Sequence, residues 1–214
     1  MPWGIDMGFF DGGLERKPER RFGAVLREIE SYWEALREDR DMPIRAEVDP
    51  RGIQRALRHA FILERMAPGM ARIRVGGSLL TDVMGMDVRG MPISSLIGTA
   101  ARDSFRLVLE DVFRGPARAR LSLSGERGMG RPALKGEMLL LPLRSSKGDV
   151  TRVLGGLEIE GQIGTRPRRF GLESSFLREL REDSKENFSF TENPAVPHTI
   201  PTKAPHLRLV VASG

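Results

Sequence analysis

Two groups of strand-like runs, separated by helical segments, are the feature that most limits how this chain can fold. The first group consists of residues 59–66 and 71–75, which the turn signal Pro68-Gly69 joins into a hairpin. Residues 71–75 alternate apolar and basic side chains, as a half-buried strand does. Three further runs, separated by turn residues, form the second group: residues 118–124, 134–143 and 150–160. This order predicts an α+β domain on a five-stranded antiparallel sheet.

The segments between the two groups have the spacing of helices that lie across one face of the sheet. Residues 79–84 are predicted to form a short helix that Ser78 caps and that stops at Gly85, and a longer helix covers about residues 100–114. The apolar side chains of the longer helix recur at helical spacing on one side: Phe105, Val108, Leu109, Val112 and Phe113. These helices would supply one apolar layer against the sheet.

An amphipathic helix is also predicted before the sheet, at about residues 22–38. One face of this helix carries a continuous apolar stripe, and the remaining positions are largely charged. The stripe needs an apolar partner, which is either the second face of the sheet or a second subunit. We expect it to bind a second copy of the chain or a separate signalling protein. The candidate contact residues are Phe22, Leu26, Ile29, Trp33 and Leu36.

The two ends of the chain differ in composition from the middle. Residues 1–21 combine glycines, a proline and charges, and we expect them to form a disordered leader. Residues 22–162 form the predicted domain. Residues 163–214 are expected to contain a basic linker, a short helix at about 172–182 and a proline-rich tail with one short apolar run, at 207–211.

Residue types that carry chemistry are scarce in this chain. It has no cysteine, which excludes disulfides, thiolate metal sites and cysteine nucleophiles. Its three histidines, His59, His198 and His206, lack the spacing of a helical metal pair. We therefore predict no catalytic residue, no metal site and no resident cofactor, and a protein that is not an enzyme. No apolar run approaches the length of about 18 residues that a membrane span needs, and we expect a cytoplasmic protein.

The chain is basic, with a net charge of +5 and a pI near 10.2. Its best electrostatic site consists of Arg166, Arg168 and Arg169, since arginines close together can hold phosphates. The alternative is that these arginines belong to a solvated linker. Binding of nucleic acid or another acidic surface through this cluster is the second hypothesis for function, although few aromatic residues are present to stack on bases.

Four stretches, taken in order, resemble a bacterial family of single-domain PAS-like proteins whose role is largely uncharacterised. The stretches are SYWEALRE followed by MPIRAEVDP, then IQRALRHAFILER, then ARIRVGGSLLTDVMGMDVRGMPISSLI, and finally LLLPLRSSKGDVTRVLGGLEI. The third stretch fits the family pattern R-x-G … G-x-D-x-x-G at Arg74, Gly76, Gly85, Asp87 and Gly90. The resemblance covers about residues 22–160. It implies a PAS-type fold, with a five-stranded antiparallel sheet and helices across one face, and it transfers no catalytic residue.

PAS domains generally sense a small ligand between sheet and helices, or bind partners. The leading hypothesis is therefore a sensory or regulatory module, without an output domain of its own, that binds an unidentified small molecule or another protein. The position of residues in a PAS-like arrangement gives the candidate pocket; the alternative is that the same residues fill a core. They are Phe61, Ile73, Met84, Phe105, Leu109, Leu123 and Leu139.

Overall fold

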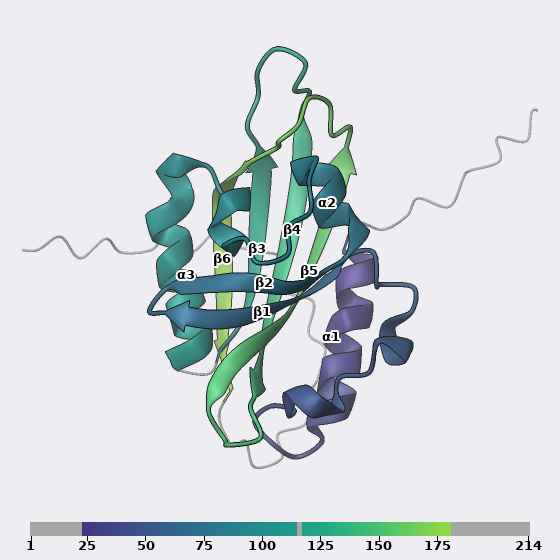
Figure 1. Ribbon diagram of the computed structural model, residues 1–214, viewed down its shortest axis with the longest axis vertical. Helices are drawn as coiled ribbons and strands as arrows, with labels where there is room; N and C mark the ends of the chain where they lie inside the picture. Colours follow the sequence, from purple (N-terminus) through teal and green to yellow (C-terminus); the bar gives the residue numbers. More distant parts are fainter. Residues whose placement is uncertain (1–22, 115–116, 181–214) are drawn as a thin grey trace, which may run out of the picture. The chain divides into compact units, whose positions relative to one another are not determined.

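The computed structural model of the chain describes residues 23–114 and 117–180 (Figure 1). Up to residue 161, helical and extended segments follow one another in the order that the hydrophobic spacing predicts. In chain order they are α1 (Ala24–Arg37), the short 3-10 turns η1 (Arg45–Glu47) and η2 (Pro50–Ile53), β1 (Ala60–Ala67), β2 (Met70–Gly76), α2 (Ser78–Met84), η3 (Ile93–Leu96), η4 (Thr99–Ala101), α3 (Arg102–Arg114), β3 (Ala117–Gly125), β4 (Leu134–Arg144), β5 (Val150–Gly161) and β6 (Phe170–Glu179).

The strands form one antiparallel sheet in the order β2-β1-β5-β4-β3-β6. The first hairpin joins the second group of strands through β1 and β5, where Leu63 lies opposite Val153. The prediction of an α+β fold on an antiparallel sheet is confirmed. In the described part of the chain the sheet has six strands, one more than predicted.

The sixth strand replaces the helix that the sequence predicts at residues 172–182. Phe170–Glu179 is extended and pairs with β3 from Gly125↔Phe170 to Ala117↔Glu179. Without β6, the edge of β3 would leave a row of backbone N–H and C=O groups without partners in the sheet. This pairing outweighs the helical propensity of the segment, so the helix prediction is wrong, and the sheet continues beyond residue 162.

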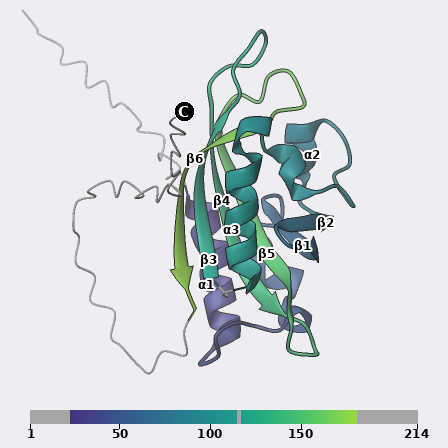
Figure 2. The same ribbon diagram turned by 90° about the vertical axis from the view of Figure 1, so that its left-hand side faces the viewer.

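The two faces of the sheet carry separate apolar clusters, here called the inner and outer faces. On the inner face, side chains of β1–β6 pack against α2, α3 and η3, which confirms the helical layer predicted between the two strand groups. On the outer face, α1 and η2 pack against β1, β4 and β5. Figure 2 shows α2 and α3 on one side of the sheet and α1 on the other.

The apolar stripe of α1 has its partner within the same chain. Leu26, Ile29 and Trp33 are fully buried against the outer face, so they are not available as the dimer or partner contact that the sequence suggested. The helix approaches closely because Gly156 has no side chain: a Cβ there would lie 2.7 Å from both Leu26 and Ile29. Leu36 is half-buried, and Phe22 lies outside the described residues.

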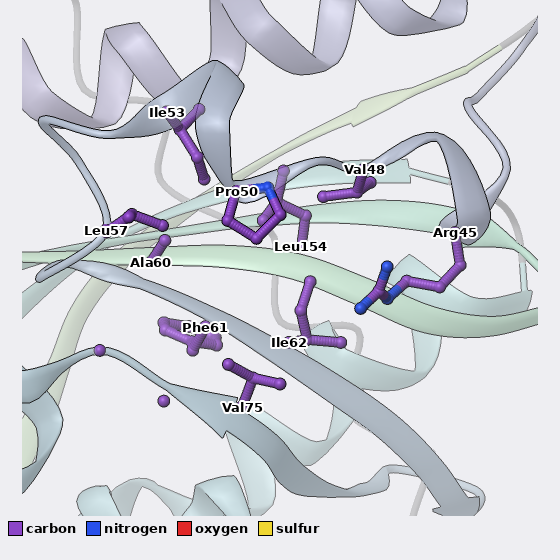
Figure 3. Close-up of a pocket in the computed structure, with 12 residues that line it drawn as sticks. Arg45, Val48, Pro50, Ile53, Leu57, Ala60, Phe61, Ile62, Val75 and Leu154 are labelled. Carbon is purple, nitrogen blue, oxygen red and sulfur yellow. The ribbon is translucent and has the colours of Figure 1, made fainter.

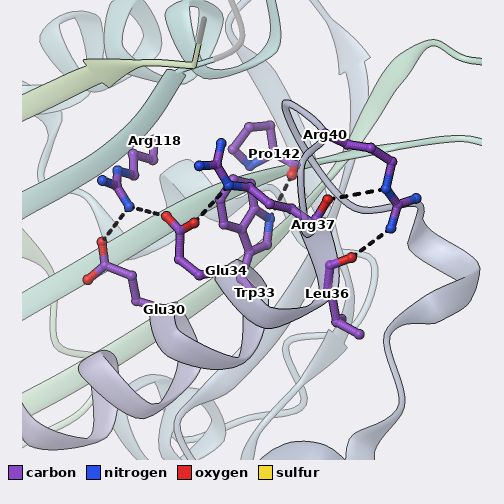
Figure 4. A network of polar contacts seen from close by, with 8 residues as sticks. All are labelled: Glu30, Trp33, Glu34, Leu36, Arg37, Arg40, Arg118 and Pro142. Atoms are coloured by element: carbon purple, nitrogen blue, oxygen red, sulfur yellow. Dashed lines mark hydrogen bonds and ion pairs between the residues drawn. The ribbon is translucent and has the colours of Figure 1, made fainter. Parts of the chain in front are cut away.

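Ion pairs set the position of α1 on the sheet (Figure 4). Arg118 binds Glu30 and Glu34, and Arg120 reaches Glu30 at 2.7 Å and Glu137 at 2.7 Å. Because Glu30 and Glu34 belong to α1 while both arginines belong to β3 and Glu137 to β4, the network connects helix and sheet rather than neighbouring turns of one element. It fixes the rotation of the helix, while the apolar stripe supplies most of the buried area.

Candidate functional site

An apolar recess on the outer face is the candidate site (Figure 3). It lies beside α1, between the η1–η2 segment and the first two strands, and its volume is about 140 Å³. Its lining is Arg45, Val48, Pro50, Ile53, Leu57, Ala60, Phe61, Ile62, Val75, Gly76, Gly77 and Leu154. All of these residues except Arg45 are apolar or glycine. The recess can therefore bury a hydrophobic group, and among the described residues that line it Arg45 is the one with an ionised side chain.

The roof of the recess is held in place by local sequence chemistry. Asp49 caps η2 by accepting a hydrogen bond from the Arg51 N–H at 2.9 Å, and Pro50 occupies the first helical position. The Tyr32 hydroxyl of α1 donates to Asp49 O at 3.0 Å and accepts from Asp49 N at 2.7 Å. Gly52 lets the Tyr32 ring approach, because a Cβ there would lie 2.2 Å from it. The roof is thus anchored to α1.

The wall of the recess depends on close contact between backbones. Gly77 donates a hydrogen bond to Ala60 O at 2.8 Å. A Cβ at Gly77 would lie 2.3 Å from the carbonyl oxygens of both Leu57 and Arg58. Only glycine allows the end of β2 to pass the start of β1 at this separation.

Two exposed apolar side chains form the mouth of the recess: Leu57 is 40% exposed and Val75 is 53% exposed. Val75 reaches the outer face because of a register shift. Ile62 pairs with Val75 but Leu63 pairs with Ile73, so one residue of β2 bulges between them. The bulge places Val75 beside Ile62 on the outer face, whereas Ile73 belongs to the inner cluster.

Arg45 gives the recess its electrostatic character. Figure 3 shows its side chain extending from η1 toward the apolar lining. It makes no hydrogen bond or ion pair with any other residue that the structure describes. The three acids nearest in sequence are already engaged: Asp41 pairs with Arg144 at 3.0 Å, the side chain of Arg40 lowers the pKa of Glu47, and that of Arg51 lowers the pKa of Asp49. Within residues 23–114 and 117–180, no acidic side chain compensates the positive charge that Arg45 places at this apolar site.

The predicted ligand pocket is distributed over both faces of the sheet. Six of its seven residues lie together in the inner cluster, each no more than 4% exposed: Phe61, Ile73, Met84, Phe105, Leu109 and Leu123. Leu139 lies in the outer cluster under α1, so its assignment to the pocket is wrong. Phe61 is the member of the set that also lines the recess. The recess itself was not predicted. Its mouth depends on the bulge that turns Val75 to the outer face, and the alternation of residues 71–75 does not indicate that bulge.

The predicted arginine cluster is divided between the interior and the surface. Arg166 and Arg169 are exposed, whereas Arg168 is fully buried. Arg168 donates to Pro132 O at 2.9 Å and to Ile163 O, and it ties the β3–β4 loop to the β5–β6 connection. Burial lowers the pKa of its guanidinium. Arg168 cannot reach a phosphate in solution, so the three-arginine site is wrong as a unit.

Residues 23–114 and 117–180 contain no group of three His, Asp or Glu side chains placed to hold a metal ion. No helix in the same two ranges has the length and apolar character needed to cross a membrane.

Glu64 on β1 is the centre of a second charge network on the sheet. Its carboxylate is 16% exposed and binds Arg72 at 2.7 Å, Arg74 at 3.2 Å and Arg152 at 2.7 Å. The hydrogen bond from Arg72, with the charges of Arg152, Arg72 and Arg74, lowers the pKa of Glu64. A lowered folded-state pKa stabilises the fold above the unfolded-state value, and this stabilisation is lost as the pH falls through the folded value.

We expect Glu64→Gln to lower the free energy of unfolding at pH 7 by about 1–3 kcal/mol, since three arginines lose their shared charge partner. The difference from wild type should shrink below about pH 4.5, where the unfolded carboxyl begins to be protonated. Urea unfolding at pH 7, 5 and 3.5 measures both effects. Glu160→Gln, at an exposed position of β5, is the matched control and should leave stability unchanged; a constant difference at all three pH values would contradict the prediction.

Comparisons with known proteins identify the family of the chain. No curated protein matches it. Similar solved structures include the light-state and dark-state structures of the blue-light photoreceptor Aureochrome1 LOV, each 18% identical in sequence. The light-state match has a TM-score of 0.38 and covers 52% of this chain and 88% of that chain, and the dark-state match has a TM-score of 0.39 and covers 51% and 80%. The family model of the PAS domain matches residues 22–158, which confirms the resemblance to PAS-like proteins, and the chain belongs to the PAS domain family.

Proposed function

We propose that this chain is a non-catalytic regulatory PAS module that acts by binding another polypeptide, with the outer-face recess as the point of contact. The observation that supports this most is the combination of an apolar cavity, two exposed apolar side chains at its mouth and Arg45, which has no acidic partner in the described part of the chain. Exposed apolar surface around a concave site marks places where proteins bind other molecules. Membership of the PAS domain family supports a regulatory role.

The size of the recess favours a side chain of a partner over a free small molecule. Pockets that bury cofactors or drug-sized ligands have volumes of about 300–1,000 Å³. A cavity of about 150 Å³ accommodates benzene, and the recess has about 140 Å³. It therefore suits one aromatic ring or one branched aliphatic side chain, which is how a protein partner anchors itself.

The proposal is tested with a probe that imitates a single anchoring side chain. We expect N-acetyl-phenylalaninamide, at millimolar concentrations, to shift the methyl NMR signals of Ile62, Leu154 and Val75 in the full chain. N-acetyl-glycinamide should shift none of them, because it has no apolar group to bury.

Leu57→Asp should weaken binding of the phenylalanine probe at least fivefold, because it places a hydrated carboxylate at the mouth of the recess. The matched control is Leu107→Asp. Leu107 is 69% exposed on α3, away from the recess lining, so this variant should bind the probe as wild type does. If neither the wild type nor the control shows shifts at the three methyl groups, the proposed function is wrong.

A further inference from the structure

We propose that the occupant of the recess is the chain's own N-terminal segment, residues 3–11, which thereby competes with any external partner. This inference rests on the proposed function of the recess and adds its regulation. The segment reads WGIDMGFFD. Its composition, its charge and the length of chain that joins it to α1 all fit the site.

The segment supplies anchoring side chains of the appropriate kind. Five of its nine residues are large and apolar: Trp3, Ile5, Met7, Phe9 and Phe10. Burial of one aromatic or branched side chain favours binding through the hydrophobic effect, and the recess has room for one such group. Gly4 and Gly8 between them allow the backbone to adapt to the mouth.

Charge complementarity favours this segment over the apolar run at residues 207–211, which is the other candidate within the chain. Residues 3–11 contain Asp6 and Asp11 and no basic residue, so a carboxylate accompanies the apolar anchors. Arg45 at the recess lacks an acidic partner among the described residues. The apolar run at residues 207–211 contains Arg208, whose charge would be repelled there.

The chain between the segment and the helix is long enough to reach the recess. Residues 11 to 24 are separated by thirteen peptide steps, which span at most about 44 Å. Tyr32 lies about 12 Å along α1 from Ala24 at 1.5 Å per residue. The Tyr32 hydroxyl bonds to the backbone of Asp49, and the next residue, Pro50, lines the recess. Binding within one chain is therefore geometrically possible.

Disulfide capture tests the proposed contact directly, because the chain has no native cysteine. We expect Gly8→Cys combined with Val75→Cys to form an intramolecular disulfide at least ten times faster than Gly8→Cys combined with Leu107→Cys. Both acceptor positions are well exposed, at 53% and 69%. Non-reducing gels of dilute full-length protein give the rates. Equal rates, or disulfides only between two chains, would overturn the proposal.

The contribution of charge is tested in the same assay. Adding Arg45→Glu to the Gly8→Cys/Val75→Cys pair should slow disulfide formation at least threefold, because Asp6 and Asp11 would then face a like charge. Arg106→Glu, at an exposed position of α3, makes the same change in net charge away from the recess and should not slow it. Equal slowing by both variants would mean that net charge, and not Arg45, controls the rate.

Probe binding separates failure of this inference from failure of the proposed function. A segment that belongs to the same chain as its site competes at an effective concentration in the millimolar range when the connection is short. Replacing Trp3, Phe9 and Phe10 by serine should therefore tighten binding of N-acetyl-phenylalaninamide about two- to tenfold. Equal affinity of wild type and variant overturns the inference and leaves the recess as a binding site. Absence of binding by both overturns the proposed function as well.

Discussion

Trp33→Ala is expected to lower the free energy of unfolding by about 3–5 kcal/mol, which is the usual cost of removing a buried large aromatic side chain. Trp33 is the largest fully buried side chain in the described part of the domain. It fills the space between α1 and the outer face, and its indole N–H donates to Pro142 O at 2.9 Å (Figure 4). Urea unfolding followed by circular dichroism measures the loss.

A conservative variant separates packing from the hydrogen bond. Trp33→Phe keeps much of the apolar volume and removes the N–H donor, so it should cost less, about 1–3 kcal/mol. The midpoint of unfolding should not depend on protein concentration, because the stripe packs on its own sheet. A loss below 1 kcal/mol for Trp33→Ala, or a midpoint that rises with concentration, would indicate that α1 packs against a second copy instead.

The alternation and spacing of apolar residues were sufficient to predict most of the elements. The predicted helix at about residues 22–38 is α1, Ala24–Arg37, and the predicted strand at 150–160 is β5, Val150–Gly161. The apolar stripe of α1 does not by itself show what the helix packs against, because a sheet face and a second subunit are equally apolar. The choice depends on Gly156, which lies more than a hundred residues away in the sequence and permits the close approach.

Leu139 shows why the candidate pocket was only partly predicted. Residues 138–143 of β4 are buried on both faces of the sheet, so the alternation that distinguishes the faces of a half-buried strand is missing. The register with β5, in which Leu139 pairs with Gly156 under α1, places this side chain on the outer face. Such a register results from pairing between distant segments and cannot be derived from β4 alone.

The recess could not be predicted from the sequence for a related reason. Strict alternation along residues 71–75 would place Val75 on the same face as Ile73. The bulge between their pairing partners reverses the direction of Val75 and creates the apolar mouth of the recess. The sequence around Arg45 does not indicate that this residue lacks an acidic partner among the described residues. Glu47, two residues away, instead accepts hydrogen bonds from Arg40 and from Ile44 N.

Gly77→Ala is expected to lower the free energy of unfolding by about 2–4 kcal/mol and to abolish probe binding at the recess. The backbone conformation at Gly77, φ −66° and ψ 159°, is open to alanine, so the cost is steric. The new Cβ would lie 2.3 Å from the carbonyl oxygens of Leu57 and Arg58. Backbone atoms cannot turn away as a side chain can, so the wall of the recess must shift, and binding of N-acetyl-phenylalaninamide should be lost.

Gly171→Ala is the matched control for this steric argument. Gly171 also lies in an extended segment, but a Cβ there would meet its nearest atom, the Ser124 hydroxyl, at an ordinary 3.5 Å. Alanine should therefore be neutral or slightly stabilising, by up to about 1 kcal/mol, because it reduces the entropy of the unfolded chain. Equal stability losses for the two variants would show that glycine flexibility, rather than backbone contact, matters at Gly77. If Gly77→Ala folds and still binds the probe, the close backbone contact at Gly77 is not needed for binding, and the probe binds at another site.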